Sequence, residues 1–434
     1  MQKEKCAYVN ARLIDPESNF DMQGSLLTEG EHIVDFGTSL FRSGVPDSIS
    51  KVIDCRGMAL IPGIVDIHTH LREPGQEHKE TIKTGTKAAA AGGVTTIACQ
   101  PNTYPPVDNL GTLSILQEKA RLHSCVNLRT YAAITKGLKG EELTDMHSLK
   151  EAGVIGFSDD GMPVSNPAVM RFALSYGSML DVPIAQHAED HALTAGGCIN
   201  EGHVSEKLGV VGIPNSSEAA IVARDIMLCK ETDSYYHALH LSTKEALAAV
   251  AQAKEQGLNV TCEVTPHHFI LNEEEVLKSG TLAKMNPPLR SEEDRKALIE
   301  GLRTGIIDCI ASDHAPHEPS AKNLPLSQAA FGIVGLETLL PLSLKLYHEG
   351  IMPLRDVLTK LTYKPADIIK ERAGRIKRNY RADLALVDLD REWTINTAKF
   401  ASKSKNSPFD GYKVRGKVLR TVVRGKTVYE DCDA

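Results

Sequence analysis

The stretch Ala59-Leu-Ile-Pro-Gly-Ile-Val-Asp-Ile-His-Thr-His70 decides the fold. It is the first of eight short apolar runs, each followed by a longer segment rich in Ala, Leu, Glu and Lys. Near-continuous apolar strands that alternate with helices are typical of a parallel β-barrel covered by helices. A doubly wound sheet is the competing α/β arrangement, but the first strand-to-helix turn has no G-x-G-x-x-G motif. We therefore expect an α/β fold with a (β/α)8 TIM-type barrel over residues 59–364.

The same alternation predicts where the barrel strands and several of the helices lie. The expected strands are Ala59–His70, Val94–Cys99, Val126–Ile134, Val154–Ser158, Val182–His187, Tyr235–Ser242, Asn259–Val264 and Asp308–Ser312. The expected helices between them include Thr81–Ala91, Pro167–Met179, Ser217–Glu231, Lys244–Gln256 and Glu292–Thr304.

Both ends of the chain have a strand-rich pattern that differs from the strand–helix alternation of the barrel. Residues 1–58 contain short strand-like pieces, Ala7–Ile14 and His32–Phe36, and no convincing long helix. Strand-like pieces return after residue 365, at Ala382–Asp388, Gly416–Val423 and Lys426–Tyr429. We therefore expect one small β-sandwich domain built from residues 1–58 and 365–434, with the barrel inserted between its two halves.

The composition excludes several classes of protein. The 434 residues include 49 Lys and Arg against 56 Asp and Glu, a formal net charge of −7. This balance argues against a sequence-blind nucleic-acid binder, which needs a basic face to neutralise phosphates. A hydrophobic content of 42% and a charged content of 24% argue against intrinsic disorder.

The sequence also indicates the cellular compartment. No apolar run approaches the roughly 18 residues of a membrane span, and Met1–Cys6 lacks the apolar core of a signal peptide. The nine cysteines are scattered, with no C-x-x-C pair, which favours a reducing environment. We expect a cytoplasmic protein that has neither a membrane nor a nucleic acid as its partner.

Histidines mark the end of the first barrel run. Residues two apart on a strand point to the same face, so Asp66, His68 and His70 would all aim inward. His70 and Arg72 would then lie at the carboxyl end of the strand, where barrel active sites form. Two adjacent imidazoles there suit a zinc-type ion, although a lone H-x-H arises by chance as readily.

Four more strands end in His or Asp, at Asp160, His187, His240 and Asp313. Each has an ordinary alternative: Asp160 suits a turn before Gly161, and Asp313 suits a helix N-cap. His187 and His240 could be satisfied core histidines. Together with the H-x-H pair, however, they place His and Asp at the same end of five strands of one barrel, which predicts a metal-centred site.

Eight segments form a specific set of motifs, and together they span essentially the whole chain: Pro62–Gly75, Gly92–Thr96, Gln100–Thr103, Phe157–Gly161, Lys284–Arg290, Ser312–His317, Phe331–Thr338 and Ser402–Phe409. With these segments the chain resembles the amidohydrolase superfamily and, more closely, its class I dihydroorotase family. A single segment, such as Gly92–Thr96, would indicate only the superfamily.

The resemblance implies a zinc centre of one or two ions, with two favoured. The first zinc would be held by His68, His70 and Asp313, and the second by His187 and His240. Asp313 would also be the catalytic proton-transfer group.

The bridging ligand between the two ions follows from the same resemblance. Hydantoinase-like relatives use a carboxylated lysine at the end of the fourth strand, whereas this chain has Phe157-Ser-Asp-Asp160 there. Class I dihydroorotases use an aspartate instead. We assign the bridge to Asp160, with the adjacent Asp159 as the alternative, and the missing lysine argues against hydantoinase or allantoinase activity.

The resemblance also implies a set of substrate contacts. Arg72, Asn102 and His317 would bind the α-carboxylate, since a guanidinium fork suits a carboxylate. The alternative for Arg72 is a salt bridge to Glu73 or Glu77 at the rim. The remaining expected contacts are His70, Asn286 for the ring amides, and the backbone at Phe331 and Gly332.

The activity implied is that of a dihydroorotase: the reversible, zinc-dependent cyclisation of N-carbamoyl-L-aspartate to L-dihydroorotate plus water, in de novo pyrimidine (UMP) biosynthesis. The alternatives are a hydantoinase or allantoinase, and a non-catalytic dihydroorotase-like partner subunit of aspartate transcarbamoylase. We expect a homo-oligomer, a dimer, and leave open a complex with aspartate transcarbamoylase. The segment His317–Ala330 could be a mobile lid or an ordinary surface loop.

Overall fold

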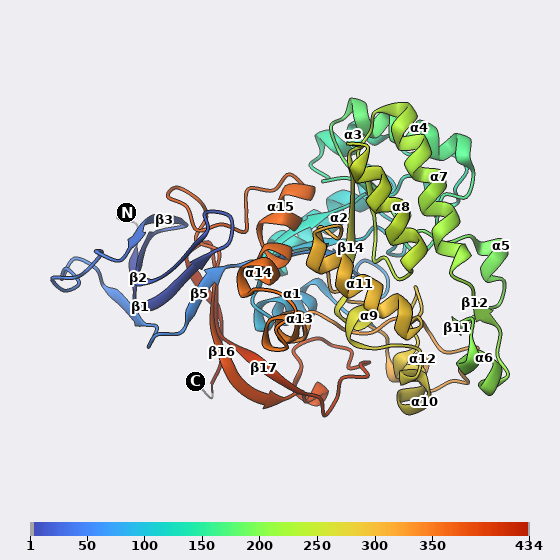
Figure 1. Cartoon of the computed structure of the whole chain (residues 1–434). Helices are drawn as coiled ribbons and strands as arrows, with labels where there is room; N and C mark the ends of the chain where they lie inside the picture. The colour runs from blue at the N-terminus through green and yellow to red at the C-terminus, as the bar shows by residue number, and fades with distance from the viewer. Residues whose placement is uncertain (1–3, 433–434) are drawn as a thin grey trace.

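The computed structural model describes residues 4–432, so residues 1–3 and 433–434 of the predicted terminal domain lie outside the described range. Strands from both ends of the chain form one eight-stranded sheet, seen in Figure 1 where blue and red strands lie side by side. Its order is β18-β17-β16-β5-β1-β2-β3, and β4 pairs with β1. The strands are β1 (Lys5–Asp15), β2 (Phe20–Glu29), β3 (His32–Gly37), β4 (Lys51–Asp54), β5 (Ala59–Pro62), β16 (Leu384–Thr394), β17 (Lys413–Val423) and β18 (Lys426–Glu430).

Eight further strands form the barrel. They are arranged as two parallel sheets, β6-β7-β8 and β15-β14-β13-β10-β9. Two parallel bridges, Ala132 with Phe157 and Thr69 with His314, join the open edges and close the ring. The strands are β6 (Ile64–Thr69), β7 (Val94–Cys99), β8 (Asn127–Thr130), β9 (Phe157–Ser158), β10 (Ile184–Gln186), β13 (Tyr236–Ala238), β14 (Val260–Val264) and β15 (Cys309–Ile310). Each predicted run contains one of them.

Helices cover the outside of this ring (Figure 1). The five predicted helices are present to within one residue at each end, as α1 (Ile82–Ala91), α4 (Pro167–Met179), α7 (Ser216–Thr232), α8 (Lys244–Glu255) and α11 (Glu292–Thr304). The other helices are α2 (Leu110–His123), η1 (Lys136–Leu138), α3 (Met146–Glu151), α5 (His191–Thr194), α6 (His203–Leu208), α9 (Pro266–Ile270), α10 (Glu275–Ser279), η2 (Gly280–Ala283), α12 (Pro319–Lys322), α13 (Leu339–His348), α14 (Leu354–Leu361), α15 (Tyr363–Ile368) and η3 (Thr397–Lys399). A two-stranded sheet, β11 (Ile199–Asn200) with β12 (Gly212–Ile213), lies between α5 and α7 in the chain.

Local chemistry explains why these segments are helical, and α11 is representative. The Ser291 side chain accepts a hydrogen bond from the Asp294 N–H and caps the helix, whose first turn is acidic. Leu298 and Leu302, four residues apart, are buried on one face. Gly305 ends the helix at a φ of 83°, a left-handed conformation that favours glycine.

The structure corrects the prediction of one continuous barrel strand over Ala59–His70. The first part, β5, pairs with β1 and β16 in the terminal sheet, and only β6 belongs to the barrel. Gly63 separates them: its N–H donates to the Asp383 carbonyl, and a Cβ there would lie 2.1 Å from the Thr95 hydroxyl. The chain therefore changes sheets at Gly63, while the division into domains at residues 58 and 365 stays a prediction.

Two strands of the terminal sheet, β2 and β4, are absent from the prediction. Within residues 4–432, none of the helices combines the length and the apolar character needed to span a membrane.

Candidate metal centre and substrate cavity

The six predicted metal ligands meet at the carboxyl end of the barrel. They come from the ends of five parallel strands, which all open toward the same edge of the ring. All six side chains are buried, with at most 6% of each residue exposed. The residues are His68 in β6, His70 just after it, Asp160 after β9, His187 after β10, His240 after β13 and Asp313 after β15.

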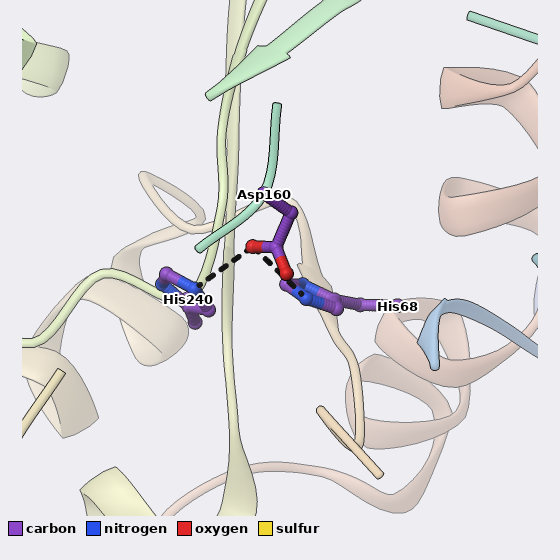
Figure 2. Close-up of side chains that lie close together, drawn as sticks. All are labelled: His68, Asp160 and His240. Carbon is purple, nitrogen blue, oxygen red and sulfur yellow. Dashed lines mark ion pairs between the residues drawn. The ribbon is translucent and has the colours of Figure 1, made fainter. Parts of the chain in front are cut away.

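Asp160 lies at the centre of this group. Its Oδ1 atom is 3.6 Å from the Nε2 atoms of His68 and His240, and Figure 2 shows it between these two rings. The same oxygen is 3.6 Å from His187 Nδ1, and Asp160 Oδ2 is 3.4 Å from His70 Nε2. One carboxylate thus faces four histidines.

The histidines divide into two pairs around Asp160. Asp313 Oδ1 lies 3.0 Å from His70 Nε2 and 3.5 Å from His68 Nε2, which makes one three-residue group. On the other side, His187 Nδ1 and His240 Nε2 are 2.8 Å apart. Asp160 is shared by both sides, as a bridging ligand would be.

These residues fit metal ions. Tetrahedral ligands about 2.0–2.1 Å from a zinc ion lie about 3.4 Å from one another. The distances between the facing atoms, 2.8 to 3.6 Å, are close to this value. His68 Nε2 and Asp160 Oδ1 are buried and have no hydrogen-bond partner. A cation between them would satisfy both atoms, because an uncompensated buried polar atom is costly.

The electrostatics keep both aspartates ionised, as metal binding requires. Burial raises the pKa of Asp160, but the charges of the surrounding histidines, led by His68, lower it to well below its usual value. The pKa of Asp313 is lowered below its usual value in the same way, against the effect of burial, chiefly by His68 and His70.

Two carboxylates behind the histidines were missed by the sequence analysis. Glu263 Oε1 lies 2.5 Å from His68 Nδ1, and Glu189 Oε2 lies 3.0 Å from His187 Nε2. Each pair uses one ring nitrogen and directs the other toward Asp160, which is the usual support for a metal-binding histidine. Glu263 could have been found, because a lone acid in the apolar run 259–264 needs a buried partner.

Asp159 does not face the histidines. Its Oδ1 atom accepts the backbone N–H groups of Ile134 and Thr135, at 2.7 and 3.1 Å. Burial raises the pKa of Asp159 to about 6. Of the two adjacent aspartates, Asp160 is therefore the one that faces the four histidines.

A cavity of about 230 Å³ opens over the candidate metal ligands. His68 is fully buried and does not line it. Every other predicted site residue does: His70, Arg72, Asn102, Asp160, His187, His240, Asn286, Asp313, His317, Phe331 and Gly332. The fold thus brings the predicted substrate contacts together beside the candidate ligands.

Comparisons with known proteins agree with this geometry. Residues 57–246 match the family model described as dihydro-orotase-like. A dihydroorotase of Wolbachia sp. subsp. Drosophila simulans (strain wRi) is 63% identical over 431 residues, which cover 99% of this chain and 97% of that protein. The chain belongs to the dihydroorotase family. A dihydroorotase of Geobacter metallireducens is 44% identical over 96% of this chain and 98% of its own length.

The fold has solved counterparts as well. The L-hydantoinase (dihydropyrimidinase) of Arthrobacter aurescens superimposes with a TM-score of 0.89 at 26% identity, over 99% of this chain and 96% of that one. The predicted fold class, the predicted family and the predicted type of enzyme, a cyclic-amide hydrolase, are confirmed by these relatives.

In this member of the dihydroorotase family, the side chain of Arg72 lines the cavity. Its Nε donates to the Pro316 carbonyl at 3.3 Å, and its Nη2 lies 3.3 Å from His317 Nε2. Burial lowers the pKa of Arg72 to about 10, so it is still charged at neutral pH. Glu73 and Glu77, its alternative partners, contact Lys119 instead.

Three site residues adopt a left-handed backbone. Arg72, His240 and Asp313 have φ values of 60°, 27° and 45°. Such a conformation costs an ordinary residue about 1–3 kcal/mol and is found disproportionately at functional sites. Each lies just beyond a barrel strand, where this turn directs its side chain to the cavity.

The amide side chains at the cavity also support other site residues. Asn102 Oδ1 lies 2.9 Å from His70 Nδ1, and Asn102 Nδ2 donates to the Asp160 carbonyl at 3.1 Å. Asn286 Nδ2 donates to Glu189 Oε2 at 2.8 Å. Asn102 is thus both a candidate substrate contact and a support for a candidate ligand.

Gly332 shapes the cavity, while its backbone groups hydrogen-bond to other parts of the protein. Its N–H donates to the Lys284 carbonyl, and its own carbonyl accepts from Asn406 Nδ2 and Lys322 Nζ. Its φ is 120°, and a Cβ would lie 2.7 Å from that of Ala315. Lys322, in the segment predicted as a lid or a surface loop, also donates to the carbonyls of Lys284 and Ala330 and so anchors that segment.

Proposed function

We propose that this chain catalyses the reversible cyclisation of N-carbamoyl-L-aspartate to L-dihydroorotate plus water, the dihydroorotase step of pyrimidine (UMP) biosynthesis. One observation carries the proposal: a carboxylate shared by four buried histidines lies in the same cavity as a partly buried arginine, Arg72. The first feature suits metal-assisted attack on a cyclic amide, and the second suits a substrate that keeps a free carboxylate.

We assign the metal as zinc and favour two ions. His68, His70 and Asp313 would hold one ion, His187 and His240 the other, and Asp160 would contact both. When bound, zinc polarises a carbonyl and lowers the pKa of water from about 15.7 to about 7. Glu263 and Glu189 would keep the ligand nitrogens of His68 and His187 directed at the ions.

Asp313 is the proposed acid and base. It is ionised, lines the cavity and lies 3.0 Å from His70. In the hydrolytic direction it accepts the proton of the attacking water as the new C–O bond forms. It then donates that proton to the ring nitrogen as the C–N bond breaks. Cyclisation is the reverse, with Asp313 taking the proton of the ureido nitrogen.

The remaining cavity residues orient the substrate. Arg72 would bind the α-carboxylate with Asn102 and His317, since its planar fork matches two carboxylate oxygens. Asn286 would bind a ring amide. We assign the backbone contact to Phe331, because the N–H and the carbonyl of Gly332 are already engaged.

The alternatives explain fewer of these features. Hydantoin and allantoin have no carboxylate, so Arg72 would have no partner in a hydantoinase or an allantoinase. A non-catalytic subunit has no need of six converging ligands. We also propose a cytoplasmic homodimer, and an assay with and without aspartate transcarbamoylase tests for that partner.

Metal analysis and a substrate panel test the proposal. The purified chain, loaded with zinc, is assayed for the opening of dihydroorotate, hydantoin and allantoin. We expect about two zinc ions per chain and turnover of dihydroorotate alone. Preferential opening of hydantoin or allantoin, or no turnover by a zinc-loaded chain, would refute it.

A further inference from the structure

The C-terminal segment Ser402–Phe409 has no part in the chemistry proposed above, yet it lies against the substrate cavity. It comes from outside the barrel, between η3 and β17. Its Asn406 is 95% buried, with 5% of the residue exposed. A polar side chain this deeply buried needs hydrogen-bond partners, and these partners indicate its role.

Asn406 bonds to two cavity-lining segments at once. Its Oδ1 accepts the backbone N–H of His317 at 3.0 Å. Its Nδ2 donates to the carbonyls of Ala315 and Gly332, at 3.1 and 3.0 Å. The Asn406 carbonyl also accepts the Val334 N–H at 2.9 Å. Both amide protons and the side-chain oxygen are thus used on the backbone around the cavity.

The two segments belong to different parts of the chain. Residues 315–317 follow β15, whereas residues 331–334 follow the α12 segment and precede α13. The backbones meet directly at Ala315 and Ile333, where the Ala315 N–H donates to the Ile333 carbonyl. Asn406 adds a side chain that spans the junction and limits sliding of one segment along the other.

The residues that flank Asn406 are anchored to the rest of the protein. Ser402 Oγ donates to the buried Glu80 at 2.5 Å, and Ser404 Oγ donates to the Lys79 carbonyl at 2.6 Å. Phe409 is 1% exposed and packs in an apolar cluster with Ile333 and Val334. The segment is therefore anchored on both sides of Asn406.

We propose that Asn406 is a positioning residue for substrate binding: it holds residues 315–317 against residues 331–334, so that His317 and the Phe331 backbone are in place to contact the substrate. The inference rests on the proposed function. Asn406 does not hydrogen-bond to any of the six candidate metal ligands, so its role is separate from metal binding.

The test compares Asn406→Ala with the matched control Ser404→Ala in the zinc-loaded enzyme. Both variants lose side-chain hydrogen bonds of the same segment, three in Asn406→Ala and one in Ser404→Ala, but the bond of Ser404 goes to the Lys79 carbonyl and not to the cavity segments. For Asn406→Ala we expect KM to rise about tenfold in both directions while kcat changes less than about threefold. Zinc content should stay at the wild-type value. For Ser404→Ala we expect a wild-type KM.

A wild-type KM in Asn406→Ala, or an equal rise in Ser404→Ala, would overturn the inference and leave the proposed function standing. A wild-type chain without dihydroorotase activity would overturn both. If Asn406→Ala does not fold, Asn406→Ser, which keeps one hydroxyl donor, is measured against the same criteria.

Discussion

Replacing Glu263 by glutamine tests whether this carboxylate supports the candidate metal ligand His68. Glu263 is fully buried, with Oε1 2.5 Å from His68 Nδ1 and Oε2 3.3 Å from His237 Nε2. Glutamine keeps the shape and one acceptor oxygen but removes the charge. A hydrogen bond to a charged group contributes about 1.5–3 kcal/mol and a neutral one about 0.5–1.5 kcal/mol, so the variant loses about 1–1.5 kcal/mol. This loss corresponds to about tenfold weaker binding of the zinc ion that His68 is proposed to hold.

The assay is a zinc titration in competition with a chromophoric chelator, on the metal-free chain. Glu274→Gln is the matched control, because Glu274 also contacts a histidine, His203, but at the surface. We expect weaker zinc binding in Glu263→Gln and wild-type binding in Glu274→Gln. An affinity of Glu263→Gln within about twofold of the wild-type value would refute the role assigned to Glu263.

Three further predictions concern turnover, substrate binding and the pH dependence of the equilibrium. Asp313→Asn should weaken zinc binding yet leave it measurable. It should also lower kcat by about 10²–10⁴-fold, because the proton acceptor is lost. Wild-type turnover in steady-state kinetics would contradict this prediction. Arg72→Lys should raise KM about tenfold, because a point charge replaces a bidentate fork, and a hydrolysis assay that gives an unchanged KM would argue against the carboxylate contact. The open substrate is a dianion and the ring a monoanion, so ring closure consumes one proton. The equilibrium ratio of ring to open form, measured by chromatography, should therefore fall about tenfold for each unit by which the pH rises near neutrality.

The barrel was predictable because its strands are buried on both faces, which requires near-continuous apolar runs. Helices such as α11 were predictable because capping and amphipathic signals are local. The break at Gly63 was not, since both halves of Ala59–His70 are apolar. The change of sheets there depends on contacts with Thr95 and Asp383, which are distant in the chain.

The candidate site followed a similar rule. The convergence of His68, His70 and Asp313 was predictable because strand ends on one side of a barrel meet whatever the details of packing. For Glu263, a lone acid in an apolar run indicates that it has a buried partner, but nothing near it in the chain identifies that partner as His68, 195 residues away. The same holds for Asn406, whose nearest cavity partner, Gly332, is 74 residues away.

The sequence alone was sufficient to predict the alternation of strands and helices, the family, and the types of side chain that line the cavity. All of these follow from periodicity and short motifs. Only the folded chain distinguished Asp160 from Asp159, because the Ile134 and Thr135 N–H groups take up one carboxylate and leave the other facing four histidines. Two adjacent aspartates are chemically identical in the sequence, and their environments differ only once the backbone around them is in place.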